Sequence, residues 1–401
     1  MTTPTALSPL PPPVWLQTII GATDPAGAAE QFWAGDPTAP VIGRYHQLGG
    51  RTHAEVTFLW REPRTAVDVL VHLNGITDAH RADLTPALLE QVSGTDLWHR
   101  TYLLPVDGTW GYRIVARPDL PPDAGHTREG WLAVHRAGEV DPRNPRHQPH
   151  ALGATSSLLV MPEAFQHPCW GPVPDLEATG QTWQLTEADG QHRTVHYTRI
   201  GAAPRRLLVC FDGEQWRALG LQAALRRARI DVELLLIESH SPERRACDLP
   251  YPERAAALFA AALEYREQML GTRVDADRVV VAGQSFGGLA AAACVLLRPD
   301  LVREAIVQSG SFWFVHGLEP RRDNPVPGEL VGRVRTGELD PGGLVFRIQA
   351  GTDEGTMVDQ ARHFHDACTA GGAKADLTVV TGGHDFAWWK HHLLRVLEET
   401  R

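Results

Sequence analysis

Residues 278–289 decide the fold, and they read Arg278-Val279-Val280-Val281-Ala282-Gly283-Gln284-Ser285-Phe286-Gly287-Gly288-Leu289. A short continuous apolar run of this kind is typical of a strand that is buried on both faces. The Ala-rich stretch that follows, as far as Leu297, has helical character. Between the two lies the pattern G-x-S-x-G, in which a sharp strand-to-helix turn exposes a serine. The stretch therefore predicts a buried strand, a strained turn at Ser285 and a helix.

Apolar strands alternate with helices throughout the second half of the chain. Further strands are predicted at residues 207–211, 232–237, 304–308, 344–349 and 375–380. Helices are predicted at residues 217–227, 252–269, 286–297 and 357–370. Such alternation predicts a mostly parallel sheet with helices on both faces, and the serine turn makes it an α/β-hydrolase fold. Strands at 181–185 and 194–199 would open this domain as an edge hairpin.

The first half of the chain has a different pattern. Short segments with period-two alternation occur at residues 53–60, 66–73, 97–104 and 110–115. Separated by Gly, Pro and Asp turns, they predict an antiparallel β-sandwich. Residues 1–20 are interpreted as a loose lead-in and residues 118–178 as an irregular linker. We therefore expect an N-terminal domain with its linker at 1–160 and a hydrolase domain at 161–401.

Composition and charge exclude several classes of protein. The chain has 401 residues, a length that fits two domains, and its net charge of −10 disfavours nucleic acid as a partner. Its apolar runs are too short to cross a membrane, and its first residues lack the features of a secretory signal. The five cysteines are scattered, which argues against a disulfide framework or a zinc site. We expect a cytoplasmic protein, and the sequence leaves its oligomeric state open.

A serine nucleophile needs a histidine base later in the chain, after an acid. Among the 19 histidines, His384 follows the last predicted strand and precedes the final helix, which is where a catalytic base belongs. The alternative is an ordinary loop or cap residue. Asp385 is interpreted as a helix cap, and His391 and His392, within a helical pattern, as surface residues.

The acid and the oxyanion donors are predicted from two other loops. Asp353 and Glu354 both follow the strand at 344–349, and spacing alone does not separate them. The backbone amide of Phe286 can face a developing oxyanion at the start of the helix. A second amide would come from Gly213 or Glu214, in the loop after the strand at 207–211. The alternative for Gly213 is a simple left-handed turn.

Taken together, the motifs resemble one family, the enterochelin (ferric enterobactin) esterases, which are cytosolic siderophore hydrolases. The likeness runs through nearly the whole chain. In the second half it is carried by the segments 211–214, 280–289, 308–313 and 382–385. In the first half it is carried by Val56-Thr57-Phe58-Leu59-Trp60-Arg61, Gly75-Ile76-Thr77-Asp78, Gly94-Thr95-Asp96-Leu97-Trp98 and Asp141-Pro142-Arg143-Asn144-Pro145.

The resemblance implies an immunoglobulin-like N-terminal domain and an esterase domain that hydrolyses the ester bonds of a cyclic tri-catecholate siderophore. It implies Ser285 as nucleophile and His384 as base, and a Gly-x-x-Glu pattern that begins at Gly351 favours Glu354 over Asp353 as the acid. No cofactor is expected, because iron would arrive only as part of the substrate. The alternatives are another esterase of the same type, acting on feruloyl or acetyl esters, and a catalytically silent siderophore-binding protein.

Binding of an anionic ferric siderophore by an acidic protein requires a local basic site. The family has an Arg-Ala-x-Glu-Leu-Pro segment, which is matched here by residues 245–250 with Asp248 in place of Glu. Arg245 is therefore the predicted substrate contact, and the alternative is a surface arginine. Three tryptophans beside the motifs could stack on catechol rings or pack in the core: Trp216, Trp313 and Trp388.

Overall fold

A computed structural model of the chain describes residues 9–63, 67–121, 123–151, 153–171, 180–187, 190–318 and 325–400. The chain divides into two compact units, each of which is discontinuous in sequence. The first unit comprises residues 1–149, 153–165 and 381–387. The second comprises residues 150–152, 166–380 and 388–401. The segment Thr381–Ala387, which the sequence places in the hydrolase domain, thus groups with the first unit.

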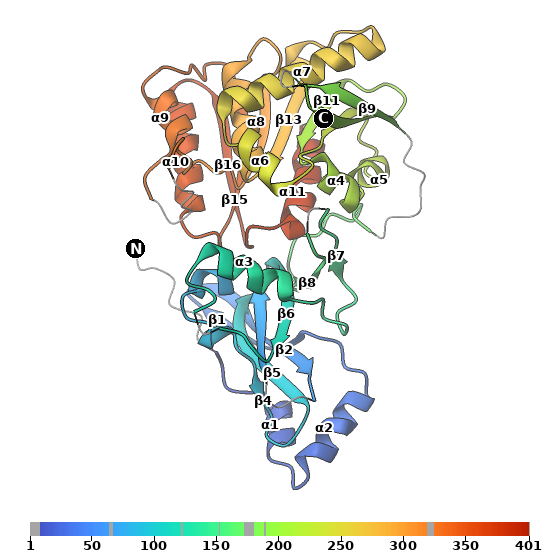
Figure 1. Ribbon diagram of the computed structural model, residues 1–401, viewed down its shortest axis with the longest axis vertical. Coiled ribbons are helices and arrows are strands. Elements are labelled where there is room, and N and C mark those ends of the chain that lie inside the picture. Colours follow the sequence, from blue (N-terminus) through green and yellow to red (C-terminus); the bar gives the residue numbers. More distant parts are fainter. Residues whose placement is uncertain are drawn as a thin grey trace. The chain divides into compact units, whose positions relative to one another are not determined.

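An eight-stranded mixed sheet forms the centre of the second unit (Figure 1). The strand order is β16-β15-β14-β13-β11-β12-β10-β9, with β11 to β16 parallel and β9 and β10 antiparallel at one edge. The strands are β9 (Gln181–Thr186), β10 (His192–Ile200), β11 (Arg206–Phe211), β12 (Val232–Ile237), β13 (Val279–Gln284), β14 (Glu304–Gln308), β15 (Val345–Gly351) and β16 (Lys374–Val380).

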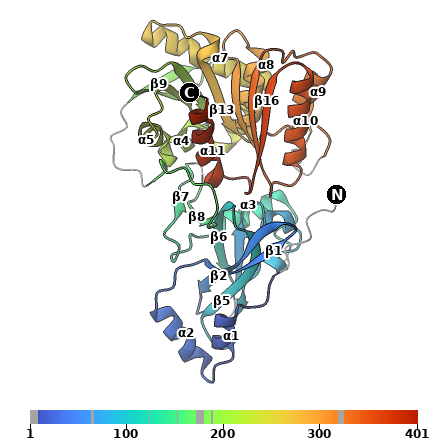
Figure 2. The ribbon, with the colours of Figure 1, turned by 180° about the vertical axis from the view of Figure 1, so that it is seen from behind.

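Helices cover both faces of this sheet. Figures 1 and 2 show α7 and α8 over one face and α4, α5 and α11 over the other. The helices are α4 (Gly213–Leu219), α5 (Leu221–Arg227), α6 (Pro242–Asp248), α7 (Pro252–Leu270), η3 (Ala276–Arg278), α8 (Phe286–Leu297), α9 (Glu329–Arg335), α10 (Met357–Ala370) and α11 (Phe386–Glu399). Alternate strand residues such as Val209, Val281 and Val307 pack in one core cluster with α7 to α10. The parallel sheet covered on both faces agrees with the prediction.

The predicted elements of the second unit match the structure closely, with one exception. The strands at 232–237 and 304–308 and the helix at 286–297 have the predicted bounds. The predicted helix at 217–227 is instead two short helices, α4 and α5, because Gly220 adopts a left-handed conformation with φ of 81° between them. Glycine takes this conformation without steric cost, so it ends α4 and begins α5.

Two four-stranded antiparallel sheets form the body of the first unit, with strand orders β1-β2-β5-β4 and β3-β6-β8-β7. Phe58, from the first sheet, packs edge-on against Tyr112 of the second at 5.0 Å between ring centroids, inside a core that both sheets share. The strands are β1 (Val41–Leu48), β2 (Arg51–Arg61), β3 (Asp68–Leu73), β4 (Glu90–Gln91), β5 (Leu97–Pro105), β6 (Thr109–Arg117), β7 (His147–Gln148) and β8 (Ser156–Val160).

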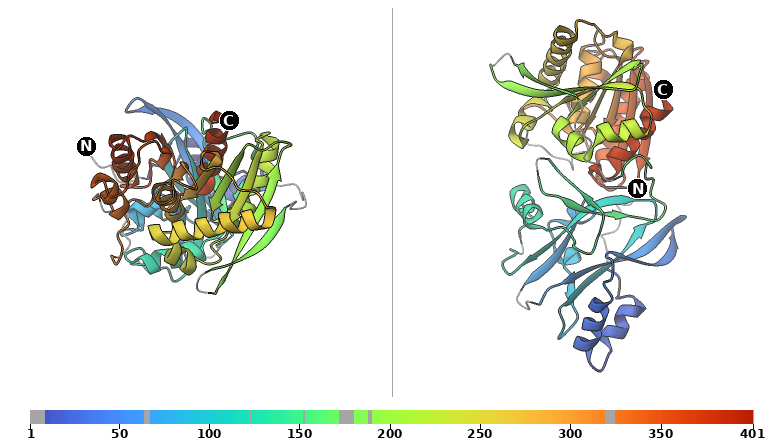
Figure 3. Two further views of the ribbon diagram at one scale, coloured as in Figure 1. Left: turned by 90° about the horizontal axis from the view of Figure 1, so that it is seen from above. Right: turned by 90° about the vertical axis from the view of Figure 1, so that its right-hand side faces the viewer.

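The first unit contains more regular structure than the sequence predicts. The expected lead-in includes α1 (Val14–Ile20), followed by α2 (Pro25–Ala34), and Figure 3 shows both helices at one end of the unit's strands. The expected linker contains α3 (Arg128–Ala137) and β8. Short 3₁₀ turns, η1 (Thr77–His80) and η2 (Thr85–Ala87), complete the unit. Each helix that the sequence analysis missed buries apolar side chains, such as Leu16 and Trp131, against neighbouring strands. These are long-range contacts, so the proline-rich local sequence does not predict them.

The prediction that His391 and His392 are surface residues is wrong. Both lie on α11 and are only 4% and 6% exposed. His391 accepts a hydrogen bond at Nδ1 from the backbone N–H of His167 at 2.9 Å. Burial, helped by the charge of Lys390, lowers the pKa of His391 to about 2, and burial lowers the pKa of His392 to about 4.

Within the described ranges, no helix is long and apolar enough to cross a membrane.

The depressed pKa of His391 makes the stability depend on pH. The unfolded chain binds a proton on this residue below pH of about 6.5, whereas the folded chain does not, so the stability is full above that pH and falls as the pH falls. Between pH 7 and 5 the loss is about 2 kcal/mol for one such histidine. Urea unfolding at pH 7 and pH 5 measures it. His391→Asn, whose amide oxygen can accept the same hydrogen bond, should lose less on acidification by that amount, and an equal loss would contradict the assignment.

Candidate active site

Ser285 occupies a strained turn between β13 and α8. Its backbone angles are φ 57° and ψ −120°, a conformation that non-glycine residues rarely adopt. Hydrogen bonds hold both backbone polar groups of Ser285: its N–H donates to the Gln308 carbonyl at 3.0 Å, and its carbonyl accepts from the Ser311 N–H at 3.1 Å. Strain of this kind is found at functional sites where the surrounding structure fixes it. The turn has the geometry expected of a nucleophile elbow.

Close backbone packing favours glycine at Gly283, which begins the motif, and at Gly288, which directly follows it. A Cβ atom on Gly283 would lie 2.0 Å from the Gly287 carbonyl oxygen, and one on Gly288 would lie 3.1 Å from the Gln308 carbonyl oxygen. A side chain at Gly283 would therefore push α8 away from β13. The two elements pack this closely only because these positions lack side chains.

The first turn of α8 is the predicted source of one oxyanion donor. Phe286 is the first residue of this 12-residue helix, so its amide has no acceptor within the helix and lies at the positive end of the helix dipole. Its ring contacts Trp313 at 5.8 Å between centroids and lies 5.8 Å from the Arg245 guanidinium carbon. The backbone is thus available for an anion, while the side chain is held by packing.

The second predicted oxyanion loop begins α4. Here the left-handed residue is Asp212, with φ of 57°, and not Gly213. Gly213 is required for another reason, because a Cβ atom on it would lie 2.9 Å from the backbone of Leu236 on β12. Glu214 follows and accepts a hydrogen bond from the Ser239 amide at 2.9 Å. Burial, with a contribution from the charge of Asp212, raises the pKa of the Glu214 carboxyl to about 7.

Arg245, on α6, forms an ion pair beside the elbow. Its guanidinium donates to both carboxylate oxygens of Asp212, at 2.7 and 2.8 Å, and to the Gln284 carbonyl at 3.1 Å. The Ser239 hydroxyl donates to the same carboxylate at 2.8 Å. This arrangement gives Arg245 a structural role, as a clamp between α6, the Asp212 turn and the end of β13. Its contact with a substrate stays a prediction.

The residues after β15 include both candidates for the acid. Glu354 is 7% exposed and accepts a hydrogen bond from the Ser309 hydroxyl at 2.7 Å. Asp353 is less buried, and its carboxylate accepts from the neighbouring Thr352 hydroxyl at 3.2 Å. A triad acid is normally buried and oriented by hydrogen bonds. The environment of Glu354 therefore supports it over Asp353.

Parallel topology brings several of these residues to one edge of the sheet. Ser285 follows β13, the loop with Ser309 and Ser311 follows β14, and Glu354 follows β15. The segment that carries His384 leaves the corresponding end of β16. In open α/β sheets, ligands bind at the carboxyl ends of the strands. The Ser285 hydroxyl lies 3.4 Å from that of Ser311, a neighbour that the sequence did not single out.

The segment Thr381–Ala387 is fixed by hydrogen bonds within the first unit. Asn74 donates from its side chain to the His384 carbonyl at 3.2 Å. Asp385 accepts from the Gly111 amide and from the Gln148 side chain, both at 2.8 Å. Asp385 also accepts from the Ala387 amide at 3.0 Å, which confirms it as the cap of α11. The sequence could not indicate these partners, because they lie more than 200 residues from Asp385.

The three tryptophans that were candidates for catechol stacking are buried. Trp216 is 0%, Trp388 2% and Trp313 5% exposed. Rings with so little accessible surface contribute to the core through packing. Burial therefore favours the packing alternative at all three positions, and stacking on a substrate ring stays a prediction.

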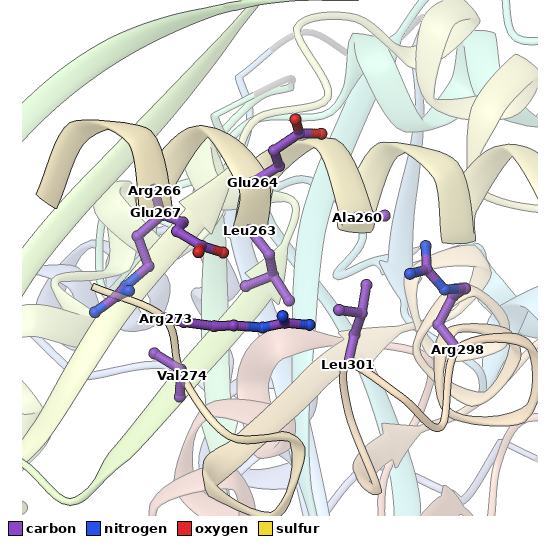
Figure 4. Close-up of a pocket in the computed structure, with 9 residues that line it drawn as sticks. All are labelled: Ala260, Leu263, Glu264, Arg266, Glu267, Arg273, Val274, Arg298 and Leu301. Carbon is purple, nitrogen blue, oxygen red and sulfur yellow. The ribbon is translucent and has the colours of Figure 1, made fainter. Parts of the chain in front are cut away.

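A pocket lies elsewhere on the second unit, along α7 (Figure 4). Its cavity volume is about 270 Å³, and its lining includes Leu263, Arg273 and Leu301. Two further arginines of the lining are engaged in ion pairs, Arg266 with Glu233 and Arg298 with Asp300. None of the lining residues is a candidate nucleophile or base, so this pocket does not compete with the Ser285 edge as the candidate active site.

The Arg245 clamp predicts a large effect on stability. Arg245→Ala leaves the Asp212 carboxylate buried without its partner, so the free energy of unfolding should fall by about 3–5 kcal/mol. Arg298→Ala removes an exposed ion pair and should cost no more than about 1 kcal/mol. Chemical denaturation of both variants tests the contrast. Equal losses would show that Arg245 does not hold the elbow.

Comparisons with known proteins agree with this geometry. The family model described as "Enterochelin esterase, N-terminal" matches residues 55–170, and the model described as "Putative esterase" matches residues 268–400. An iron(III) enterobactin esterase from Dickeya dadantii is 32% identical over 381 residues, covering 84% of this chain and 86% of the relative.

Solved structures agree as well. The ferric enterobactin esterase of Salmonella typhimurium superimposes with a TM-score of 0.78 at 27% identity, covering 92% of this chain and 99% of the other. The enterobactin esterase of Shigella flexneri, crystallised in the presence of enterobactin, gives a TM-score of 0.76 at 26% identity, with 92% and 97% coverage. With an elbow at Ser285 and similarity along nearly its full length, this chain belongs to the enterochelin esterase family.

Proposed function

We propose that this protein is a serine esterase that hydrolyses the ester bonds of a ferric tri-catecholate siderophore of the enterobactin type. The strained elbow at Ser285 carries the proposal, because a serine held in this rare backbone conformation at a strand-to-helix turn is the arrangement of a nucleophile elbow. Family membership supports the substrate class, since the relatives are named as iron(III) enterobactin esterases. A cyclic tri-ester of this type is opened when one of its acyl groups is transferred to a serine hydroxyl.

In the proposed mechanism, His384 accepts the proton of the Ser285 hydroxyl, which attacks an ester carbonyl. The developing oxyanion is stabilised by the amide of Phe286 and by that of Gly213 or Glu214. Glu354 holds the imidazole in the required tautomer and stabilises the imidazolium. The alcohol leaves with a proton from His384, and water then hydrolyses the acyl-enzyme with His384 again as base. In this proposal no resident cofactor takes part, and iron enters only as part of the substrate.

The proposed substrate is anionic, and the protein has a net charge of −10. Arg245 is the proposed contact for the substrate, although its guanidinium is already shared with Asp212. The carboxyl group of Glu214, which lies close to Arg245 and has a raised pKa, favours contact of Arg245 with an anionic substrate. Glu214, whose pKa burial raises to about 7, is partly protonated near neutral pH and adds less negative charge there than an ordinary glutamate.

We infer that the two antiparallel sheets of the first unit form an immunoglobulin-like sandwich, on the basis of the core that they share. We infer a cytoplasmic location from the five scattered cysteines, all of which are free thiols, as is usual in a reducing compartment. The siderophore is the proposed partner, and the acidic charge argues against nucleic acid.

Substitution of the nucleophile is the decisive experiment. Ser285→Ala should lower turnover of an iron-loaded tri-catecholate trilactone by more than about a thousandfold, with the open-chain products followed by chromatography. Labelling by a fluorophosphonate should be lost in parallel. The wild-type protein is screened with iron-loaded and iron-free trilactones and with feruloyl and acetyl esters.

The outcomes separate the alternatives. Hydrolysis of feruloyl or acetyl esters without trilactone hydrolysis would indicate another esterase of the same fold. Siderophore binding without turnover or labelling of the wild type would indicate a silent binding protein. Full turnover by Ser285→Ala would overturn the mechanism.

A further inference from the structure

The side chain of Ser309, just after β14, joins two buried groups that no local sequence motif connects. Its hydroxyl oxygen lies 2.7 Å from Glu354 Oε1 and 2.9 Å from Trp389 Nε1. All three side chains belong to the second unit, and Ser309, Trp389 and Glu354 are 1%, 3% and 7% exposed. The three residues form a buried hydrogen-bonded chain, Trp389–Ser309–Glu354.

The direction of both hydrogen bonds follows from the chemistry of the groups. An indole N–H can only donate, so the Ser309 oxygen must accept from Trp389. The single hydroxyl proton of Ser309 is then directed at Glu354, whose Oε1 accepts it. A hydrogen bond from a hydroxyl to a carboxylate is charge-assisted and about twice as strong as a neutral one. The tryptophan therefore fixes the rotation of the hydroxyl in the orientation that serves the carboxylate.

The backbone around Ser309 is fixed as firmly as its side chain. Ser309 has a left-handed conformation with φ of 49°, and its N–H donates to the Gln349 carbonyl of β15 at 2.7 Å. The Gln308 side chain donates to the Gln349 side chain at 2.6 Å and to the Trp389 carbonyl at 2.9 Å. The neighbouring Gln284 donates to the Gln308 side chain at 2.9 Å. These three buried glutamines tie the elbow strand, β14, β15 and α11 into one network.

We propose that Ser309 is a positioning residue for the esterase reaction, which orients the Glu354 carboxylate, and that Trp389 fixes the Ser309 hydroxyl. The proposal rests on the proposed function, in which Glu354 is the acid of the triad. A buried carboxylate that must stabilise an imidazolium needs donors that hold its charge and its plane. Ser309 supplies such a donor from a strand end adjacent to the elbow strand.

A positioning role predicts a specific kinetic pattern. Ser309→Ala removes the donor and should lower kcat by about ten- to a hundredfold, because a hydrogen bond to a charged group is lost. KM should change less than about twofold, since Ser309 does not contact the substrate in this proposal. Ser309→Thr restores a hydroxyl and should recover most of the lost kcat. Turnover of the iron-loaded trilactone and thermal unfolding are measured for each variant.

A pair of tryptophan variants separates the fixing of the hydroxyl from general packing. Trp389→Phe removes the indole donor to Ser309 and should lower kcat several-fold with KM unchanged. Trp170→Phe is the matched control, because the Trp170 indole donates at 2.8 Å to the Lys390 carbonyl of the same helix but does not contact Ser309. The control should leave kcat unchanged. Threonine at this left-handed position could destabilise the fold and make Ser309→Thr uninformative. In that case the comparison of Trp389→Phe with Trp170→Phe still tests the positioning role of Ser309.

Parallel assays of Ser285→Ala and Glu354→Gln separate failure of this inference from failure of the proposed function. If Ser285→Ala or Glu354→Gln keeps wild-type turnover, the proposed triad is wrong. If both variants are inactive while Ser309→Ala keeps the wild-type kcat, the triad stands and the role of Ser309 is refuted. An equal fall in kcat for Trp389→Phe and Trp170→Phe would likewise refute the role of Trp389.

Discussion

The backbone of Ser285 is the constraint on which the second unit depends. A non-glycine residue in this conformation costs about 1–3 kcal/mol, and the surrounding structure must offset it. Gly283 packs closely against Gly287, and Gly288 packs closely against β14. The Ser285 backbone also forms hydrogen bonds with Gln308 and Ser311, at and just after the end of β14. The sharp turn directs the chain from a buried strand straight into a helix. Within the second unit, the candidate groups Gly213 and Glu354 follow parallel strands of the same sheet, β11 and β15.

Two kinds of polar contact support the turn on its two sides. On the β11 side stands a charged pair, Arg245 with Asp212, which reaches the elbow strand through the Gln284 carbonyl. On the β14 side stands a neutral row of glutamine amides. Neutral amides make directional hydrogen bonds without the desolvation cost of charges, so they can be buried completely. Beside the elbow, the described contacts on the β11 side are thus those of a charged pair, and those on the β14 side are those of neutral glutamine amides.

The sequence predicted the second unit better than the first for physical reasons. Continuous apolar strands such as 232–237 are buried on both faces and leave an unmistakable pattern, and the serine motif adds its own geometry. The break between α4 and α5 at Gly220 was not predicted, because an isolated glycine is tolerated within a helical pattern. Helix α2 was missed although Asp24 caps it and Pro25 begins it. Ser309 and Trp389 lie 80 residues apart, and periodicity, being local, could not pair them.

The discontinuous division of the chain also bears on how such a protein can evolve. The segment around His384 finds its hydrogen-bond partners in residues that precede it by more than 200 positions, such as Gln148 and Gly111. Cutting the gene between the two halves would separate that segment from the groups that hold it. Recombination that exchanges whole domains between relatives would therefore have to preserve both sides of this arrangement. The first unit needs residues from both halves of the sequence, so a single cut between the halves does not yield two complete units.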